Sequence, residues 1–468
     1  MANNHQEPVS ATALDEALYE KYIRPTQRPR SSLVGVEFEL PVVNLSGQAV
    51  SFRTVHEMTE EFVRRFPFDT LHRDDEGEIY SAVRSGNGDT LSYDCSYNTL
   101  ELSFGTEGDM HTIEDRFRAY YTVIQSMLQQ SGHSLTGMGI NPHYRVNLNE
   151  PVPNGRYRML LHHLKSYRRY GHSIPFHHHP NFGLFSCASQ VQLDVDEKTL
   201  PEVLNTFTKL EPLKSLLFAN SPWGRRNEVL CGRDYFWKNS LHGLNRHNVD
   251  MYSIDFSSSD EILSYIKSMS IYCVERGEKY INFRPTLLED YFSADNVEGE
   301  YFSEGGYRSI RFEPSIEDLK YLRSFKFEDL TYRGTVEFRS VCTQPVRDIM
   351  ASAAFHAGLM EKLPALTDLL DGDRVLYHRG YNASELRCLL NRREFPHFLR
   401  KSEITALAFN VLDIASDGLR ARGLHEEGYL APLYQRAETL TSPALRMAEE
   451  LENGRPLGEL IADYAALS

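Results

Sequence analysis

The sequence has little cysteine, no long apolar run and no excess of positive charge. Its six cysteines are scattered over 468 residues without a close pair, which excludes a CxxC redox motif, a zinc ribbon and a dense disulfide framework. We expect reduced and mostly buried thiols. No stretch of eighteen uncharged apolar residues occurs, so no helix is predicted to cross a membrane. Residues Met1 to Pro8 are polar and lack the apolar segment of a secretory signal, and we therefore expect a cytoplasmic protein.

The negative charge restricts the partners. A net charge of −15 argues against general nucleic-acid binding, which depends on a basic face that attracts phosphates. An acidic protein can still bind a nucleotide if its carboxylates recruit Mg²⁺. Apolar residues make up 41% and charged residues 25% of the chain, as in ordinary globular proteins. The length is compatible with one large domain or two lobes.

Several familiar motifs are missing. The sequence contains no G-x-x-x-x-G-K-[ST] loop, no H-E-x-x-H helix and no G-x-S-x-G elbow, and Gly137 and Gly139 lack the other glycines of a dinucleotide-binding turn. The run His177 to His179 lies between Pro175 and Pro180. Because three consecutive residues of an extended chain cannot all face one ion, we favour a solvated loop there over a transition-metal site.

The pattern of apolar residues predicts strands interspersed with long helices. Residues 33–43 alternate between apolar and other residues, as in a half-buried strand. Further strands are expected at 78–84, 88–94, 98–104, 182–195 and 331–341. Helices are expected at 15–25, 54–66, 110–131, 155–170, 198–219 and, almost without interruption, from about 346 onward. This order is typical of an α+β fold with a mainly antiparallel sheet.

The strand at 33–43 carries two carboxylates on one face. Glu37 and Glu39 lie two residues apart, and Gly35 leaves space on the same face. Burial of neighbouring like charges costs several kcal/mol unless a cation neutralises them. A single E-x-E pair most often belongs to a solvated face. This pair therefore indicates a cation site only if other strands place further polar side chains beside it.

Other expected strands do add polar positions. These are Asp94 and Glu101; Gln190, Gln192 and Asp194; and Glu337 with Arg339. Each group alone is explained by solvent exposure or by a cross-strand salt bridge. Together they supply oxygen ligands for Mg²⁺ and one guanidinium for a phosphate, which is what an ATP site on a sheet requires. Several acids spread over several strands indicate two or more ions.

In its motifs the chain resembles glutamate–cysteine ligases, specifically the plant-type branch of the carboxylate–amine ligase superfamily. The resemblance covers roughly residues 33–450 and rests on eight landmarks in order. They are Val34 to Glu39, Leu100 to Ser103, Gly137 to Gly139, Asn154 to Tyr157, Ser189 to Asp194, Leu217 to Pro222, Val336 to Arg339, and Asp417 to Leu419 with Arg422-Gly423.

The resemblance implies a glutamine-synthetase-like fold: a curved antiparallel sheet flanked by helices, with a helical C-terminal region. It implies an N-terminal lead at 1–32, a catalytic part at 33–345 and helices at 346–468 packed on the same domain. The implied metal ligands are Glu37, Glu39, Asp94, Glu101 and Glu337. Glu337 and Arg339 are implied as catalytic, Arg339 and Gln192 as ATP-binding, and Gln190, Arg233 and Trp237 as substrate-binding.

The implied reaction is an ATP- and Mg²⁺-dependent ligation. The γ-carboxylate of glutamate is phosphorylated and the amine of cysteine then attacks it. Gln192 stands where the family usually has Asn, and residues 223–240 and 284–330 depart from the family pattern. An alternative is therefore the same chemistry with another amino acid or amine; a ligand sensor and a small-molecule kinase are further alternatives. Neither a nucleic acid nor a membrane is expected as a partner, and a monomer and a homodimer both stay open.

Overall fold

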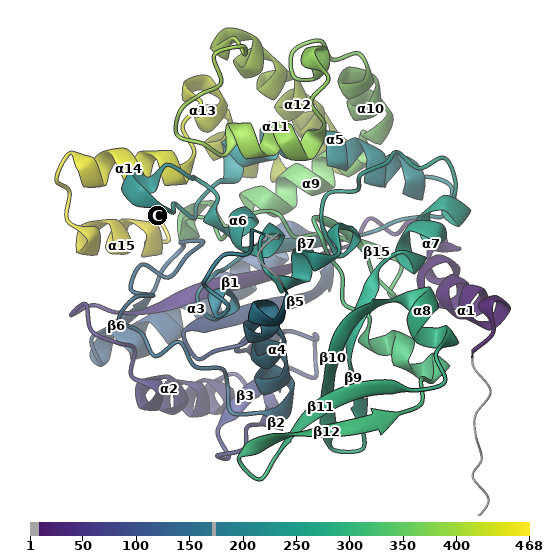
Figure 1. Ribbon diagram of the computed structural model, residues 1–468. Coiled ribbons are helices and arrows are strands. Elements are labelled where there is room, and N and C mark those ends of the chain that lie inside the picture. Colours follow the sequence, from purple (N-terminus) through teal and green to yellow (C-terminus); the bar gives the residue numbers. More distant parts are fainter. Residues whose placement is uncertain (1–8, 171–174) are drawn as a thin grey trace, which may run out of the picture.

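The computed structural model describes residues 9–170 and 175–468. The polar lead Met1 to Pro8 lies outside the described residues. Most strands of the described residues gather in two sheets, and two further strands form a short pair. Helices flank both large groups of strands (Figure 1). Among the described helices, none combines the length and the apolar character that a membrane span needs.

The large sheet is built around the strand that the sequence predicts at 33–43. This strand, β1 (Val34–Asn44), pairs with its neighbours in the order β14-β15-β7-β1-β5-β4-β3-β2, and β6 also pairs with β1. All of these pairings are antiparallel. The other strands are β2 (Asp69–Arg73), β3 (Ile79–Val83), β4 (Thr90–Ser92), β5 (Thr99–Glu107), β6 (His133–Leu135), β7 (Ser189–Asp194), β14 (Glu328–Leu330) and β15 (Thr335–Phe338).

Helices cover the apolar face of this sheet. Val36, Phe38 and Leu40 of β1 are fully buried, because alternate side chains of a strand point to the same face. Phe38 packs edge-on against Phe117, with ring centroids 5.4 Å apart. The covering helices are α2 (Phe52–Arg65), α3 (Met110–Gln130), α5 (Leu200–Phe218) and α9 (Ala351–Glu361). The opposite, polar face is thereby left for the functional site.

A smaller antiparallel sheet lies beside the polar face. Its strands are β9 (Ser270–Arg276), β10 (Lys279–Leu287), β11 (Val297–Ser303) and β12 (Gly306–Phe312). Helix α4 (Gly155–Lys165) packs against β10 and β11 (Figure 1). Short β8 (Val249–Asp250) and β13 (Phe325–Lys326) form a parallel pair. The remaining helices of this half are α1 (Ala11–Leu18), α6 (Gly232–Lys238), α7 (Ser259–Lys267) and α8 (Leu288–Ser293).

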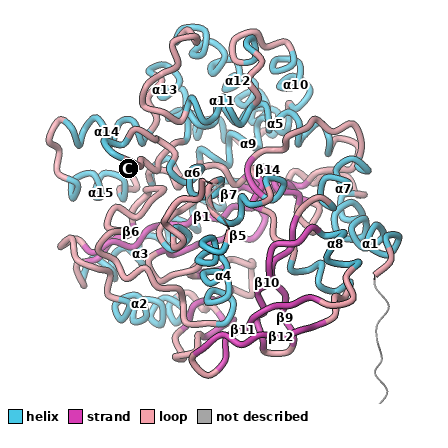
Figure 2. Tube along the Cα trace, in the orientation of Figure 1, coloured by secondary structure: helices cyan, strands magenta, loops and turns pink. Residues whose placement is uncertain are grey.

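The C-terminal part is helical, as the sequence predicts. It comprises α10 (Leu363–Asp371), α11 (Ala383–Leu390), α12 (Lys401–Arg422), α13 (Ala431–Thr439), α14 (Pro443–Glu452) and α15 (Leu457–Ala465). Helices α10 to α13 lie together at the top of Figure 2, away from the strands. Helices α11 and α13 pack on α5, and α12 packs on α9. The α+β class is confirmed, while the division into 1–32, 33–345 and 346–468 stays a prediction.

Several expected strands are shorter than predicted. The strand expected at 88–94 is limited to Thr90–Ser92. Within 182–195 only Ser189–Asp194 is a strand, and Phe182–Leu184 is a 3₁₀ turn. Phe182 and Phe185 instead pack around Phe236, in an aromatic cluster separate from the main core. Within 331–341 the strand is limited to Thr335–Phe338. Apolar content alone cannot distinguish a strand from a buried turn.

The prediction of a solvated histidine loop is wrong for His177. Its side chain is buried, and Nε2 donates to the carbonyl oxygen of Phe236 at 2.8 Å. Nδ1 accepts from the backbone N–H of His179 at 3.0 Å. Burial lowers the pKa of His177 to about 4, so the ring is neutral. Both ring nitrogens are thus used within the protein core.

The expectation for the cysteines is confirmed. All six are free thiols, and five of them are buried.

One landmark of the sequence resemblance is explained by helix packing. Gly418 of α12 faces Gly358 of α9 so closely that a Cβ at 418 would lie 1.9 Å from the carbonyl oxygen of Gly358. We expect Gly418→Ala to lower the free energy of unfolding by about 1–3 kcal/mol, because the two helices must separate. Urea unfolding measures this change.

The matched control is Gly458→Ala in α15, where no atom lies within 4 Å of the added Cβ. Alanine favours a helix by up to about 1 kcal/mol over glycine, so this variant should be as stable as the unsubstituted chain or more so. Equal stability of Gly418→Ala and the unsubstituted chain would contradict the packing argument.

Candidate active site

Register in the large sheet brings the predicted carboxylates onto one face. Glu39 of β1 lies opposite Glu101 of β5. On the other side of β1, Glu37 lies opposite Gln190 of β7. One strand further, Gln192 of β7 lies opposite Glu337 of β15. Directly opposite residues of an antiparallel pair share a face, so three acidic strands converge as the sequence suggested.

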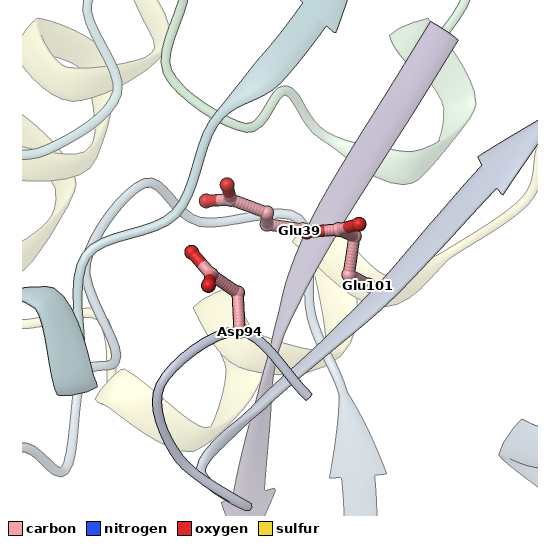
Figure 3. A group of neighbouring side chains, drawn as sticks. All are labelled: Glu39, Asp94 and Glu101. Atoms are coloured by element: carbon pink, nitrogen blue, oxygen red, sulfur yellow. The ribbon is translucent and has the colours of Figure 1, made fainter. Parts of the chain in front are cut away.

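Asp94 joins this face from a loop. It follows β4, and its carboxylate lies with those of Glu39 and Glu101 so that one oxygen from each is within 4.8 Å of the others (Figure 3). The next residue, Cys95, has φ of 67°, a conformation that is uncommon for residues other than glycine. The chain therefore turns sharply at the point where Asp94 enters the group.

Amide and hydroxyl groups hold the carboxylates apart. Gln190 donates its side-chain N–H to Glu39 at 3.1 Å and to Glu37 at 3.3 Å. Gln192 donates to Glu37 at 2.8 Å and to Glu337 at 3.3 Å. Glu101 accepts hydrogen bonds from two serine hydroxyls, those of Ser92 and Ser103. These neutral donors orient the oxygens without cancelling their charge.

The electrostatic cost of this arrangement appears in the pKa values. Burial, together with the charges of Asp94 and Glu101, raises the pKa of Glu39 to about 8. Burial and Asp94 raise the pKa of Glu101 to about 7. Burial and Glu337 raise the pKa of Glu37 well above its ordinary value. Protons or cations must therefore compensate these charges.

One guanidinium compensates part of the charge. Arg339 follows β15 and donates to Glu337 at 2.8 Å. Burial lowers the pKa of Arg339, but the carboxylates of Glu337 and Asp329 outweigh that effect and raise it above its ordinary value. Arg339 is thus a permanent positive charge at the edge of the acidic face. The carboxylates still outnumber it, and their oxygens are the ligands that Mg²⁺ prefers, so this set of residues fits divalent cations.

A cavity of about 640 Å³ opens over the acidic face. Glu37, Glu39, Asp94 and Glu101 lie at one side of its lining. Its other walls carry four arginines, which are Arg156, Arg233, Arg323 and Arg339, together with aromatic rings including Tyr157, Trp237, Tyr280 and Phe325. Acidic and basic walls that face one cavity can hold a cation and an anionic ligand at once.

The predicted substrate residues Arg233 and Trp237 lie in this lining on α6. The Arg233 guanidinium is buried and donates to the carbonyl oxygens of Arg339, Ser340 and Val341 at 3.2–3.4 Å. Trp237 stacks on Phe325, with centroids 4.9 Å apart. Arg233 therefore anchors the segment that carries Arg339.

A buried charge network supports this segment from behind. Arg387 of α11 donates to Asp234 at 2.7 Å, to Glu211 at 2.5 Å and to the carbonyl oxygen of Ser340 at 3.3 Å. The Ser340 hydroxyl donates to Glu211 at 2.8 Å, and Glu211 also pairs with Lys214. Removal of one member of a buried pair typically costs about 3–5 kcal/mol. The C-terminal helices thus help to fix the position of Arg339.

The structure brings most of the predicted residues together and adds others. Glu337 and Gln192 share the acidic face but are not part of the cavity lining. Arg323 was not predicted: it lies in irregular chain before β13, inside the region that departs from the family pattern. Arg156 was noted only as a landmark. A basic residue outside a strand or helix carries no periodicity that would identify it.

Comparison with known proteins identifies the family. Residues 33–459 match the family described as Glutamate-cysteine ligase family 2 (GCS2), and the chain belongs to this family. Chloroplastic glutamate–cysteine ligase of Medicago truncatula is 22% identical over 410 residues, which are 86% of this chain and 74% of that protein. The enzyme of Arabidopsis thaliana is 22% identical over 361 residues, 75% of this chain and 64% of that protein. The match confirms the resemblance and the predicted class of enzyme.

A solved structure shares the fold. Glutamate–cysteine ligase from Francisella tularensis, in complex with AMP, superposes with a TM-score of 0.50 at 12% sequence identity, and the match covers 94% of this chain and 88% of that one.

The prediction of a cytoplasmic location is wrong on these comparisons, because the plant relatives are chloroplastic proteins. The prediction relied on the absence of an apolar secretory segment. Transit peptides are instead amphipathic and rich in serine and arginine, so that absence does not distinguish the cytoplasm from a plastid.

Neutralising Glu39 should change the pH dependence of stability. The pKa of Glu39 rises from an ordinary value of 4.5 to about 8 in the folded chain. Between these values the folded state binds more protons than the unfolded state, so the free energy of unfolding falls as the pH rises. Glu39→Gln should make this fall shallower, as measured by urea unfolding in a chelator at about pH 6 and about pH 8.

Mg²⁺ provides the complementary measurement. Because the ion competes with protons for the same oxygens, it should raise the midpoint of thermal unfolding more at about pH 8 than at about pH 6. The exposed variant Glu57→Gln serves as control. Identical pH profiles for Glu39→Gln and the unsubstituted chain would contradict the electrostatic account.

Proposed function

We propose that the protein joins the γ-carboxylate of glutamate to the amine of cysteine, with cleavage of ATP to ADP and phosphate. Family membership supports the reaction type. The observation that carries the proposal is the convergence of acidic and basic walls on one cavity. A carboxylate is a poor electrophile and needs activation, so a phosphate-binding and a carboxylate-binding region must meet there.

Glu37, Glu39, Asp94, Glu101 and Glu337 would hold two or more Mg²⁺ ions. When bound, Mg²⁺ neutralises phosphate charge and orients the transferring group. Glu337 is assigned a second task, because its hydrogen bond fixes the Arg339 guanidinium. Gln190 and Gln192 orient the carboxylates between which they lie, and Gln192 is proposed to contact ATP.

Arg339 would stabilise the charge that spreads over the transferring phosphoryl oxygens. In-line attack by the γ-carboxylate of glutamate on the γ-phosphorus of ATP gives γ-glutamyl phosphate and ADP. The neutral amine of cysteine then attacks the activated carbonyl carbon, forms the amide bond, loses a proton and releases phosphate. No step requires a covalent bond to the protein.

The arginines opposite the acidic face suit the amino acids. Arg233, Arg156 and Arg323 line the cavity, and a guanidinium can bind a carboxylate through two parallel hydrogen bonds. They are proposed to hold the α-carboxylates of glutamate and cysteine, with Trp237 bounding the pocket. Cysteine is assigned as acceptor from the family, and another small amine is the alternative.

Removal of one acidic ligand should abolish turnover while leaving the fold intact. We expect Glu101→Gln or Glu37→Gln to lower the rate of ADP release by about a hundred-fold or more, because a bound divalent ion supplies several kcal/mol of charge stabilisation. The thermal midpoint should not fall, since each substitution removes a buried charge. Glu403→Gln, on the exposed face of α12, is the matched control. Near-normal ADP release at saturating Mg²⁺ would refute the assignment.

The acceptor is identified by product analysis. The protein is incubated with ATP, Mg²⁺, glutamate and a panel of amines, and products are identified by mass spectrometry. We expect ADP and a γ-glutamyl amide only when glutamate and cysteine are both present. ADP with a stable phosphorylated product would indicate a kinase. Amide formation with a different amine would identify that amine, and not cysteine, as the acceptor.

A further inference from the structure

A second and larger cavity, of about 1210 Å³, lies on the other side of α4. Residues of β10, β11 and β12 line it, and residues of α4 line it as well. Figure 1 shows α4 beside this sheet. A bulge in β10 interrupts the register between Asn282 and Thr286. Bulges near sites redirect side chains, and both residues line this cavity. None of the carboxylates assigned to Mg²⁺ does so.

Two buried side chains in the lining carry polar atoms without a hydrogen-bond partner among the described residues. Asn282 is 4% exposed, and among the described residues neither atom of its amide has a hydrogen-bond partner. His163 is 2% exposed, and its Nε2 also lacks a partner within that part of the chain. Burial of an unpaired polar group is unfavourable, so such groups are expected where a ligand supplies the missing bonds. An amide that can both donate and accept matches another amide.

Charges of both signs surround these groups. Arg169 lines the cavity and is paired with Glu300. Arg284 and Arg311 also line it, and within residues 9–170 and 175–468 neither forms an ion pair. Glu298 lies in the same lining. A ligand with one carboxylate and one ammonium group is complementary to this mixture.

We propose that this cavity is a second binding site, for a small zwitterion that contains an amide, such as a dipeptide. The ligand's amide pairs with Asn282, and its carboxylate pairs with the guanidinium of Arg311. The site is separate from the catalytic cavity and does not depend on the reaction proposed above.

A wall of aromatic rings separates the two cavities. His163, which lines the second cavity, stacks on Tyr272 at 3.7 Å and lies 5.5 Å from His242. His242 lines the catalytic cavity and lies 5.5 Å from Trp237. The rings of His163 and His242 therefore lie between a ligand in the second cavity and the proposed substrate pocket. Contiguous packing of this kind can transmit a change in side-chain position from one cavity to the other.

Calorimetric titration with glycylglycine tests the proposal on the whole chain. Asn282→Leu should weaken binding by about ten-fold or more, and it should raise the thermal midpoint, because it removes two unpaired polar atoms from the interior. A purely structural role of Asn282 would instead lower that midpoint. Arg311→Gln should also weaken binding. Arg308→Gln, on the same strand but paired with Glu304 outside the cavity, should not.

Glu101→Gln tests whether glycylglycine binds in the catalytic cavity instead. If it binds in the second cavity, this variant should bind it as tightly as the unsubstituted chain. Three results would overturn the proposal. They are absence of binding at millimolar glycylglycine, unchanged binding by Asn282→Leu, and loss of binding in Glu101→Gln, which would assign the dipeptide to the catalytic cavity. Failure of the ligase assay would leave this test unaffected.

Discussion

The structure depends on the burial of like-charged carboxylates on one face of an antiparallel sheet. Glu37 and Glu39 of one strand and Glu101 of the next lie together on this face. Burial raises the pKa of all three carboxyl groups, and the charge of Glu101 raises the pKa of Glu37 and Glu39 further. Such an arrangement is unfavourable for a protein alone. Divalent cations, together with phosphates bound to them, would offset this cost if they occupied the cavity. The fully covered apolar face of the same strands supplies the stability that tolerates this cost.

Parts of the chain that are distant in sequence hold the site rigid. The segment after β15 that carries Arg339 is fixed by Arg233 of α6, and α6 is fixed in turn by Arg387 of α11 through Asp234. The C-terminal helices thus contribute to the position of the Arg339 guanidinium although none of their residues lines the cavity. Close approach of α9 and α12 at Gly358 and Gly418 sets the packing of this layer.

The acidic face could be predicted because strand periodicity is a local property. The alternation of apolar and polar residues around Glu37 and Glu39 fixes which side chains share a face. The same alternation holds in the other strands of the acidic face. The predictions that failed concern residues whose structure depends on tertiary contacts. Phe182 and Phe185 looked like strand residues but serve an aromatic cluster, and His177 looked solvated but is buried. Arg323 lies in irregular chain, where no periodicity marks a functional side chain. The landmark at Gly418 reflects helix packing rather than chemistry.

The central claim is that this face positions the γ-phosphoryl group of ATP for transfer to a carboxylate. The most direct measurement uses glutamate labelled with ¹⁸O in its γ-carboxylate, together with ATP, Mg²⁺ and cysteine, and determines the isotope content of the released phosphate by mass spectrometry. Transfer through γ-glutamyl phosphate predicts one labelled oxygen in each phosphate formed with the amide. Amide formation that releases only unlabelled phosphate would contradict the account.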